Sequence, residues 1–363
     1  MKLRKHRWQH YFSIRSTYTF VLFCAVFYLF VIVIAALTAS LWLPDKTPDA
    51  NLQHNELPRL KPGTSVDFFA ELGSLESQHV VGIPLADTLP NYGFVADSFW
   101  YAPRLGSIVT LAYTESGTNA VQKKPKVELR ETYLQQSIHT QTFWLGTDPL
   151  GRDVFSRLIL GARVSLGVGI LGAVLSLVIG LLVGLMAGYL GGGIDQFLTA
   201  IMSLIWSLPA VLLTVALSFA FGKGFLPMTL AIALALWVDL ARVVRGQVQS
   251  LKQREFVLGA KVLGASTNRI LLLHITPHLG RILLILSCAN FSTAILLEAG
   301  LSFLGMGISA PTPSWGGMIF EGYSHLMVPG SRWIALGPGL MLILQLISVN
   351  FIVVGLKKSL PKD

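Results

Sequence analysis

The stretch VSLGVGILGAVLSLVIGLLVGLMAGYL, residues 164–190, decides the fold because it contains no charged residue from end to end. A helix needs about 20 apolar residues to cross the roughly 30 Å of hydrocarbon in a bilayer, so this stretch is predicted to span a membrane. Small residues that recur at every fourth position allow a neighbouring helix backbone to approach closely, either at a moving interface or in static packing. They are Gly172, Ser176, Gly180, Gly184, Gly188 and Gly192.

Apolar runs of similar length recur along the chain. Of its 363 residues, 53% are hydrophobic and only 13% are charged, which is about half the charged share of a soluble domain. We therefore predict an all-α integral membrane protein with six transmembrane helices. The other five runs lie near residues 19–43, 197–221, 225–242, 281–305 and 333–356. Pro209 predicts a kink in the run near 197–221.

Basic residues mark one side of the predicted bundle. Lysines and arginines concentrate in the N-terminal segment, in the loop 243–280 and at the C-terminus, and such an excess is typical of cytoplasmic segments. Both termini and this loop are therefore predicted to be cytoplasmic. The same bias explains the net charge of +9, so no nucleic-acid partner is expected. The first apolar run is longer than a cleavable signal core, which favours an uncleaved helix.

The runs divide the chain into segments. Residues 44–145 are polar and interrupted by prolines and glycines, so we expect an extracytoplasmic insert containing a short strand within 107–114. The sequence leaves the fold and the role of this insert open. The predicted division is a cytoplasmic N-terminus 1–18, a first transmembrane helix 19–43, the insert 44–145, an interfacial motif 146–161, a membrane domain 162–356 and a cytoplasmic tail 357–363.

No sequence motif indicates nucleotide or metal chemistry. The phosphate-binding pattern G-x-x-x-x-G-K-[ST] does not occur, and residues 222–224 (GKG) are its nearest fragment. Cys24 and Cys288 lie inside apolar runs, where they are expected to behave as small buried hydrophobes. We therefore predict that the chain is not an enzyme, holds no metal and binds no cofactor directly.

The loop 243–280 contains a second helical pattern. Phe256, Ala260 and Leu263 follow one another at intervals of four and three residues, so they are predicted to share one face of a short helix. Gly264 is able to end that helix with a positive φ angle. Such a helix would lie across the cytoplasmic mouth of the bundle and offer an apolar knob to a soluble partner.

Two further motifs border the predicted outer surface. One is WLGTDPLGRDVFSRLILGARVSL at 144–166, and the other is EAGLSFLGMG at 298–307, followed by PTPSWG at 311–316. The four-residue spacing of Asp153 and Arg157 suits a helix with self-compensating charges. This region is either a gate or docking edge, or an interfacial helix held by ion pairs.

Three charged residues inside the apolar runs also need an explanation, because a charge in a membrane span is costly. Glu298 is expected to pair with an arginine of the 144–166 motif, and a substrate or proton role is the alternative. Asp239 and Arg242 are expected to form a local pair.

Together the three motifs resemble the type I permeases of ABC importers, in the dipeptide, oligopeptide and nickel branch. The loop 255–278 looks like that family's EAA loop, although Leu258 and Gly259 replace its Glu-Ala pair and Thr276 replaces a leucine. The 144–166 motif is similar to W-L-G-T-D-x-x-G-R-D-x-x-S-R, and the later motif to E-A-x-L-S-F-L-G-x-G and P-x-P-S-W-G. The resemblance runs from about 144 to 356 and leaves residues 44–140 outside it.

The resemblance implies a C-type permease subunit in the cell inner membrane, with 162–356 as the type I permease domain. It would work with a second homologous permease, an extracytoplasmic substrate-binding protein and two cytoplasmic ATPase subunits that use the ATP. Its cargo would be peptides, nickel or related small solutes. The implied ATPase-coupling residues are Glu255, Phe256, Ala260, Leu263, Gly264, Ile270 and Pro277. The implied outer-face residues are Gly146, Asp148, Gly151, Arg152, Asp153, Arg157, Gly161, Arg163, Glu298, Ser302, Gly305, Trp315 and Gly316.

Two other classes of protein fit the apolar runs alone. An ion-coupled secondary transporter usually shows inverted repeats and polar groups at mid-membrane, and a non-transport scaffold would use residues 44–145. The first lacks support because no repeat is evident. The second leaves the helix that ends at Gly264 unexplained.

Overall fold

The computed structural model describes residues 2–69 (except 46, 48, 55 and 56), 108–111, 127–130 and 138–358 (except 330). Five of the helices in this part of the chain are long and apolar enough to cross a membrane, or six if one bent pair counts as a single span. These helices are α1 (Lys2–Trp42), α3 (Val154–Leu190), α6 (Phe225–Leu251), α9 (Thr276–Phe303) and α11 (Trp333–Lys358), with the bent pair α4 (Gly192–Trp206) and α5 (Ala210–Phe221). The predicted multi-span helical fold is thus confirmed.

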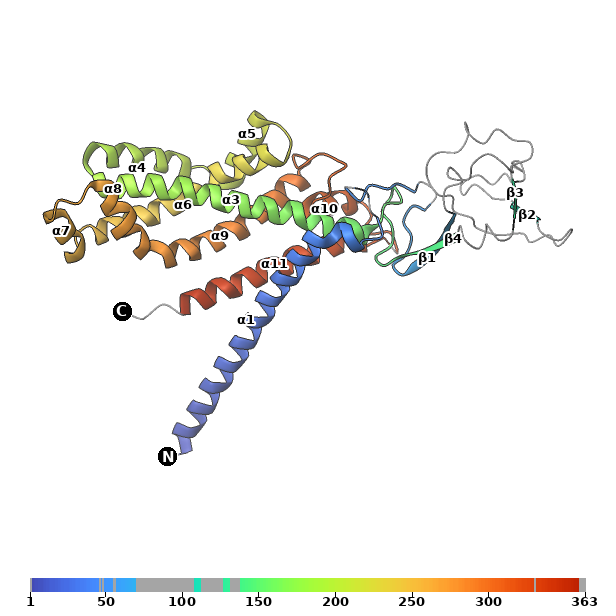
Figure 1. Ribbon diagram of the computed structural model, residues 1–363, viewed down its shortest axis with the longest axis horizontal. Coiled ribbons are helices and arrows are strands. Elements are labelled where there is room, and N and C mark those ends of the chain that lie inside the picture. Colours follow the sequence, from blue (N-terminus) through green and yellow to red (C-terminus); the bar gives the residue numbers. More distant parts are fainter. Residues whose placement is uncertain are drawn as a thin grey trace.

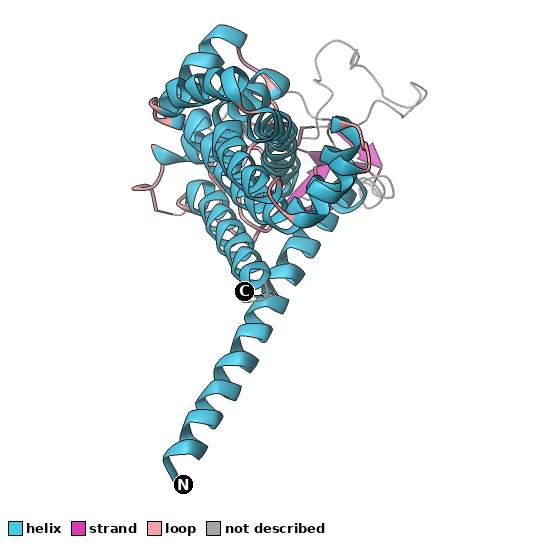
Figure 2. Cartoon of the chain, turned by 90° about the vertical axis from the view of Figure 1, so that its left-hand side faces the viewer, coloured by secondary structure: helices cyan, strands magenta, loops and turns pink. Residues whose placement is uncertain are grey.

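Shorter elements lie at the two ends of this bundle, as Figure 1 shows. At one end are α7 (Glu255–Val262), α8 (Thr267–Arg269) and the π-helix η3 (Ile270–Ile275). At the other end are α10 (Trp315–Tyr323) and the described strands. Both chain termini point toward the α7 end, and α1 extends away from the other helices, most clearly in Figure 2.

The described strands of the insert form two antiparallel ladders. Strand β1 (Thr64–Phe69) pairs with β4 (Ile138–Phe143), and β2 (Ile108–Leu111) pairs with β3 (Val127–Arg130). The predicted strand within 107–114 is therefore present as β2. The β1–β4 ladder brings together the two ends of the polar segment, so this segment begins and ends as one paired stem.

The glycine ladder of α3 packs directly on the backbone of α6. A Cβ added at Gly180, Gly184 or Gly188 would lie 2.7, 2.7 or 2.8 Å from an α6 carbonyl oxygen. Those oxygens belong to Trp237, Ala241 and Arg245. Glycine at these positions is what allows the two helices to touch. Within the subunit the ladder therefore serves as close packing, whereas Gly192 has a positive φ of 59° in the turn after α3.

Substitution of Gly184 tests this packing. Gly184→Ala is expected to lower the stability of the detergent-solubilised protein by about 1–3 kcal/mol, since the new methyl group would lie 2.7 Å from the Ala241 carbonyl oxygen. Gly280→Ala in α9 is the matched control, because a Cβ there meets nothing within 4 Å and alanine favours the helix. Thermal unfolding of both variants should shift in opposite directions, and equal shifts would contradict the packing argument.

Several predicted boundaries change. Helix α1 already begins at Lys2, α6 continues to Leu251 beyond the predicted end near 242, and α9 begins at Thr276 before the predicted start near 281. The bend predicted at Pro209 is present, but it is a 92° break between α4 and α5 across residues 207–209 and not a kink within one helix. Helix α3 already begins at Val154, so the predicted boundary between residues 161 and 162 falls inside it. The first turns of α3 therefore contain the second half of the 146–161 motif.

The expected local pair of Asp239 and Arg242 is wrong. Asp239 instead accepts a hydrogen bond from the indole Nε1 of Trp206 at 2.9 Å. Arg242 donates to the Ser203 hydroxyl at 3.1 Å, and its guanidinium lies 4.3 Å from the centre of the Trp206 ring. Helix α4 lies alongside α6 and supplies these partners, which helical spacing within α6 does not reveal.

Candidate functional site

The loop before α3 is folded tightly against the chain near residue 57. Thr147 donates its hydroxyl to the Leu57 carbonyl at 2.5 Å and accepts from the Leu60 amide at 2.8 Å. Gly146 and Gly151 have φ angles of +74° and +73°, and a Cβ on either would collide with a backbone carbonyl. Both predicted glycines are therefore required by backbone shape and by close approach.

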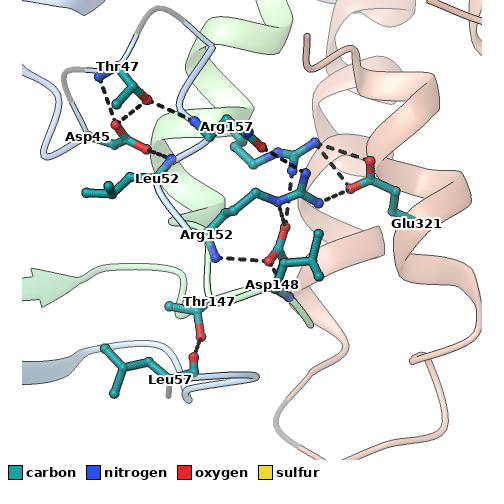
Figure 3. A network of polar contacts seen from close by, with 11 residues as sticks. Asp45, Thr47, Leu52, Leu57, Thr147, Asp148, Arg152, Arg157 and Glu321 are labelled. Carbon is teal, nitrogen blue, oxygen red and sulfur yellow. Dashed lines mark hydrogen bonds and ion pairs between the residues drawn. The ribbon is translucent and has the colours of Figure 1, made fainter. Parts of the chain in front are cut away.

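Four charged side chains form one cluster beside this loop, which Figure 3 shows from close by. Asp148 accepts from Arg152 Nε at 2.5 Å and from Arg157 Nη1 at 3.2 Å. Both arginines also reach the Glu321 carboxylate, at 2.7 and 3.2 Å. We call Asp148, Arg152, Arg157 and Glu321 the charge cluster. It joins the start of α3 to α10.

Burial makes the charge cluster an integral part of the fold. The side chains of Asp148, Arg152 and Arg157 are at most 5% exposed, whereas that of Glu321 is 33% exposed. Burial raises the pKa of Glu321, and the nearby Arg152 charge opposes that rise. The predicted compensation of Asp153 by Arg157 within one helix is wrong, because Arg157 binds Asp148 and Glu321, which come from two different elements.

The remaining charged residues of the 144–166 motif, Asp153 and Arg163, fix the start of α3. Asp153 caps the helix, because its carboxylate accepts from the amides of Phe155 and Ser156. Burial raises the pKa of Asp153, and the hydrogen bonds from Ser156 oppose the rise. Arg163 donates to the carbonyls of Ala36 and Leu37, so it ties α1 to α3.

The 144–166 motif packs against the motif that comprises 298–307 and 311–316. Trp315 is fully buried, donates its indole N–H to the Leu158 carbonyl at 3.0 Å, and lies against Gly161. Its backbone amide donates to Ser165 Oγ at 3.1 Å. Gly316 sits so close to α9 that a Cβ would lie 2.6 Å from Ala299 Cα. The two sequence motifs therefore form one junction of α3, α9 and α10.

Glu298 does not pair with an arginine, contrary to the prediction. It is fully buried, and its carboxylate accepts from Ser165 Oγ at 3.0 Å and Ser302 Oγ at 2.8 Å. The arginines of the 144–166 motif bind Asp148, Glu321 and the carbonyls of α1 instead. Hydroxyl donors from two helices compensate this carboxylate, which sequence position alone could not indicate.

Helix α7 ends at Gly264 as predicted. Gly264 has a φ of +79°, its amide donates to the Lys261 carbonyl, and the Ala265 amide donates to the Ala260 carbonyl, both at 3.0 Å. This pair of bonds is a Schellman motif, which needs a left-handed residue at the glycine position. Gly305 ends α9 by the same pattern, with a φ of +77° and a 2.9 Å bond from the Met306 amide to the Leu301 carbonyl.

The faces of α7 differ from the predicted ones. Val257 is buried and Ala260 partly buried against the helices that follow, whereas Val262 and Leu263 are 87% and 88% exposed. Leu258 is also exposed, at 49%. The predicted common face of Phe256, Ala260 and Leu263 is therefore wrong, because Ala260 faces the bundle and Leu263 faces outward. We call Leu258, Val262 and Leu263 the α7 knob.

The rest of the loop holds α7 on the bundle. Phe256 stacks on the His278 ring, with the ring centres 4.7 Å apart. Ile270 is buried in the same apolar cluster as Val257, and Pro277 lies in the first turn of α9. Glu255 is exposed in the first turn of α7. Ile270 and Pro277 thus support the helix, while the exposed residues remain available for contact.

Sequence reasoning missed several partners. Glu321 completes the charge cluster, Ser165 links Glu298 to Trp315, and Asn51 accepts from Arg152 at 3.3 Å. Glu321 lies in α10, which begins with Trp315 and Gly316 of the 311–316 motif, and only this proximity along the chain could have drawn attention to it. Ser165 lies within the 144–166 motif, but a serine in an apolar run carries no distinct signal.

The fold and these two regions define a multi-pass membrane protein with a short exposed helix at one end and a buried polar junction at the other. The family described as binding-protein-dependent transport system inner membrane component matches residues 180–362. The chain belongs to this family, and it is a permease subunit of an ABC importer, a transport component rather than an enzyme. The predicted class is confirmed.

The two OppC relatives given first agree with this assignment. The oligopeptide transport system permease protein OppC of Escherichia coli (strain K12) is 39% identical over 221 residues, covering 61% of this chain and 72% of that protein. OppC of Bacillus subtilis (strain 168) is 37% identical over 220 residues, covering 60% and 72%. An inward-facing structure of the MetNI methionine ABC transporter matches with a TM-score of 0.48 at 15% identity, covering 57% of this chain and 98% of its own.

Proposed function

We propose that this permease carries peptides, in an assembly with a second homologous permease, two ATPase subunits and an extracytoplasmic binding protein. The similarity to permeases named for oligopeptide transport supports the peptide cargo. ATP would be bound and hydrolysed by the ATPase subunits, since the chain has no phosphate-binding loop motif. In this proposal both termini and α7 are cytoplasmic, as the distribution of lysine and arginine indicates.

The observation that carries the proposal is the α7 knob. Three apolar side chains are held outward on a short helix whose other face is anchored by Val257, and the helix ends in a fixed turn at Gly264. An exposed apolar group of this kind suits insertion into a cleft of a soluble protein. In the proposed assembly that protein is an ATPase subunit, and closure of the ATPase dimer moves α7.

The cargo is tested by uptake. The complete importer, reconstituted in proteoliposomes with its binding protein, is expected to accumulate labelled oligopeptide in the presence of ATP. Nickel ion supplied under the same conditions should not accumulate. Accumulation of nickel without peptide would overturn the proposed cargo but leave the permease assignment intact.

The docking role of the α7 knob is tested by Val262→Asp. Because Val262 is almost fully exposed, the change should leave folding intact but place a charge in the proposed apolar contact. We expect roughly tenfold weaker retention of the ATPase subunits on the tagged permease, in line with the loss of an interface anchor. Gln253→Asp is the matched control, since it adds the same charge at an exposed polar position before α7. Equal retention in the two variants would contradict docking through the knob.

A further inference from the structure

A row of polar contacts runs between α4 and α6. At one end of the row, Asp195 accepts two hydrogen bonds from Arg245, at 2.5 and 2.7 Å, so both charges are compensated. At the other end, Asp239 and Arg242 do not form an ion pair. Asp239 binds the Trp206 indole N–H, and Arg242 binds Ser203 and the face of the Trp206 ring.

These two charges retain free bonding capacity. In the described chain Asp239 receives one hydrogen bond, although a carboxylate accepts about four, and its side chain is exposed. Arg242 donates one hydrogen bond to a side chain and has no carboxylate within 4 Å in the same part of the chain. We call Trp206, Asp239 and Arg242 the mid-span group.

The mid-span group lies near the middle of α6, a candidate membrane span that continues nine residues beyond its predicted end near residue 242. Asp239 is about 21 Å from the start of α6 and about 18 Å from its end, at 1.5 Å per residue. The α4–α5 break is next to it, since α4 ends at Trp206 and residues 207–209 are exposed. Both an uncompensated charge and a non-helical backbone are tolerated at such depth only beside water or other protein.

We propose that the mid-span group lines the transport pathway and contacts the charged end of a passing peptide. The Asp239 carboxylate would accept from the peptide α-ammonium, and the Arg242 guanidinium would donate to a peptide carboxylate or carbonyl. A zwitterionic ligand matches an acid and a base that are held apart by one indole. This inference rests on the proposed peptide cargo.

The surroundings favour a pathway over a subunit contact. Helices in membranes associate through small residues and close packing, whereas the residues beside the break are large and apolar. Leu204, Leu208 and Leu212 are 71%, 50% and 61% exposed. These large exposed side chains flank the break and do not provide the small-residue surface of a close helix contact.

Peptide selectivity provides the first test. In proteoliposomes holding the complete importer, Asp239→Asn is expected to lower the ratio of uptake of a free-amine peptide to uptake of its N-acetylated analogue by about tenfold. That change corresponds to the loss of one charge-assisted hydrogen bond. Asp195→Asn is the matched control, because its partner is Arg245, and it should lower both uptakes together.

Other outcomes overturn the inference in distinct ways. An unchanged ratio in Asp239→Asn, with the assembly intact, removes the contact with the peptide terminus. If Asp239→Asn lowers the uptake of both peptides and the second permease no longer co-purifies, the mid-span group belongs to a subunit interface instead. If the wild-type importer carries no peptide at all, the proposed function fails, and the peptide ligand fails with it.

Thiol labelling tests the pathway without relying on transport. In a Cys24→Ser, Cys288→Ser background, Ser207→Cys in the assembled importer should react with a charged, water-soluble thiol reagent, and saturating peptide should slow the reaction at least severalfold. Ser176→Cys, at a fully buried position, is expected to stay unlabelled. Absence of labelling at residue 207 would place the break against protein or lipid and overturn the inference.

Discussion

Gly264→Val is expected to abolish ATP-driven uptake while the protein still inserts into the membrane. The φ of +79° at Gly264 is costly for any residue with a side chain, by about 1–2 kcal/mol, and most of all for a β-branched one. Relief of that strain unwinds the Schellman turn and moves Leu263, which is part of the α7 knob. Uptake and binding-protein-stimulated ATP hydrolysis in proteoliposomes measure the loss.

Gly280→Val is the matched control for this prediction. A Cβ at either glycine meets nothing within 4 Å, but only Gly264 has a positive φ. The two variants therefore differ in backbone strain and not in crowding. If Gly264→Val retains normal ATP-driven uptake, the geometry of α7 does not couple ATP hydrolysis to transport.

Asp148→Asn is expected to destabilise the α10 end of the bundle by about 3–5 kcal/mol. The amide leaves two buried guanidinium groups with only Glu321 as a counter-ion, and an uncompensated buried charge has a cost of this size. Thermal unfolding in detergent and accessibility of the β1–β4 end to protease should both report the change.

Glu321→Gln is the internal comparison, since Glu321 accepts from the same two arginines. Its side chain is 33% exposed against 3% for Asp148, so water replaces part of the lost interaction. The loss of stability should be clearly smaller than for Asp148→Asn. A larger loss in Glu321→Gln would show that α10, and not the loop before α3, holds the charge cluster together.

Local rules predicted several features of the fold correctly. Uninterrupted apolar length identified the spans, and Gly264 ended α7 because only one common residue type accepts its φ angle. The strand expected within 107–114 is present as β2. Each of these depends on neighbours in sequence, which is why the chain alone carries the information.

Features that depend on contacts between elements were not predictable in the same way. The sequence could not show that Glu298 would bind hydroxyls, because Ser165 comes from another helix. Nor could it show that Trp206 would separate Asp239 from Arg242. The prediction of the outward face of α7 was wrong for the same reason, since the packing of Val257 against later helices decides which side of α7 is buried.

The uninterrupted course of α9 has one further mechanical consequence. This helix leaves the α7 region at Thr276 and continues to Phe303, a length of about 42 Å. Its far half contains the buried Glu298 and packs against Gly316 of α10. A rigid rod of that length that tilts by about 5° about one end sweeps its far tip through nearly 4 Å. A small change of tilt imposed at one membrane surface would thus become a displacement of several ångström at the other, without any element between them having to bend.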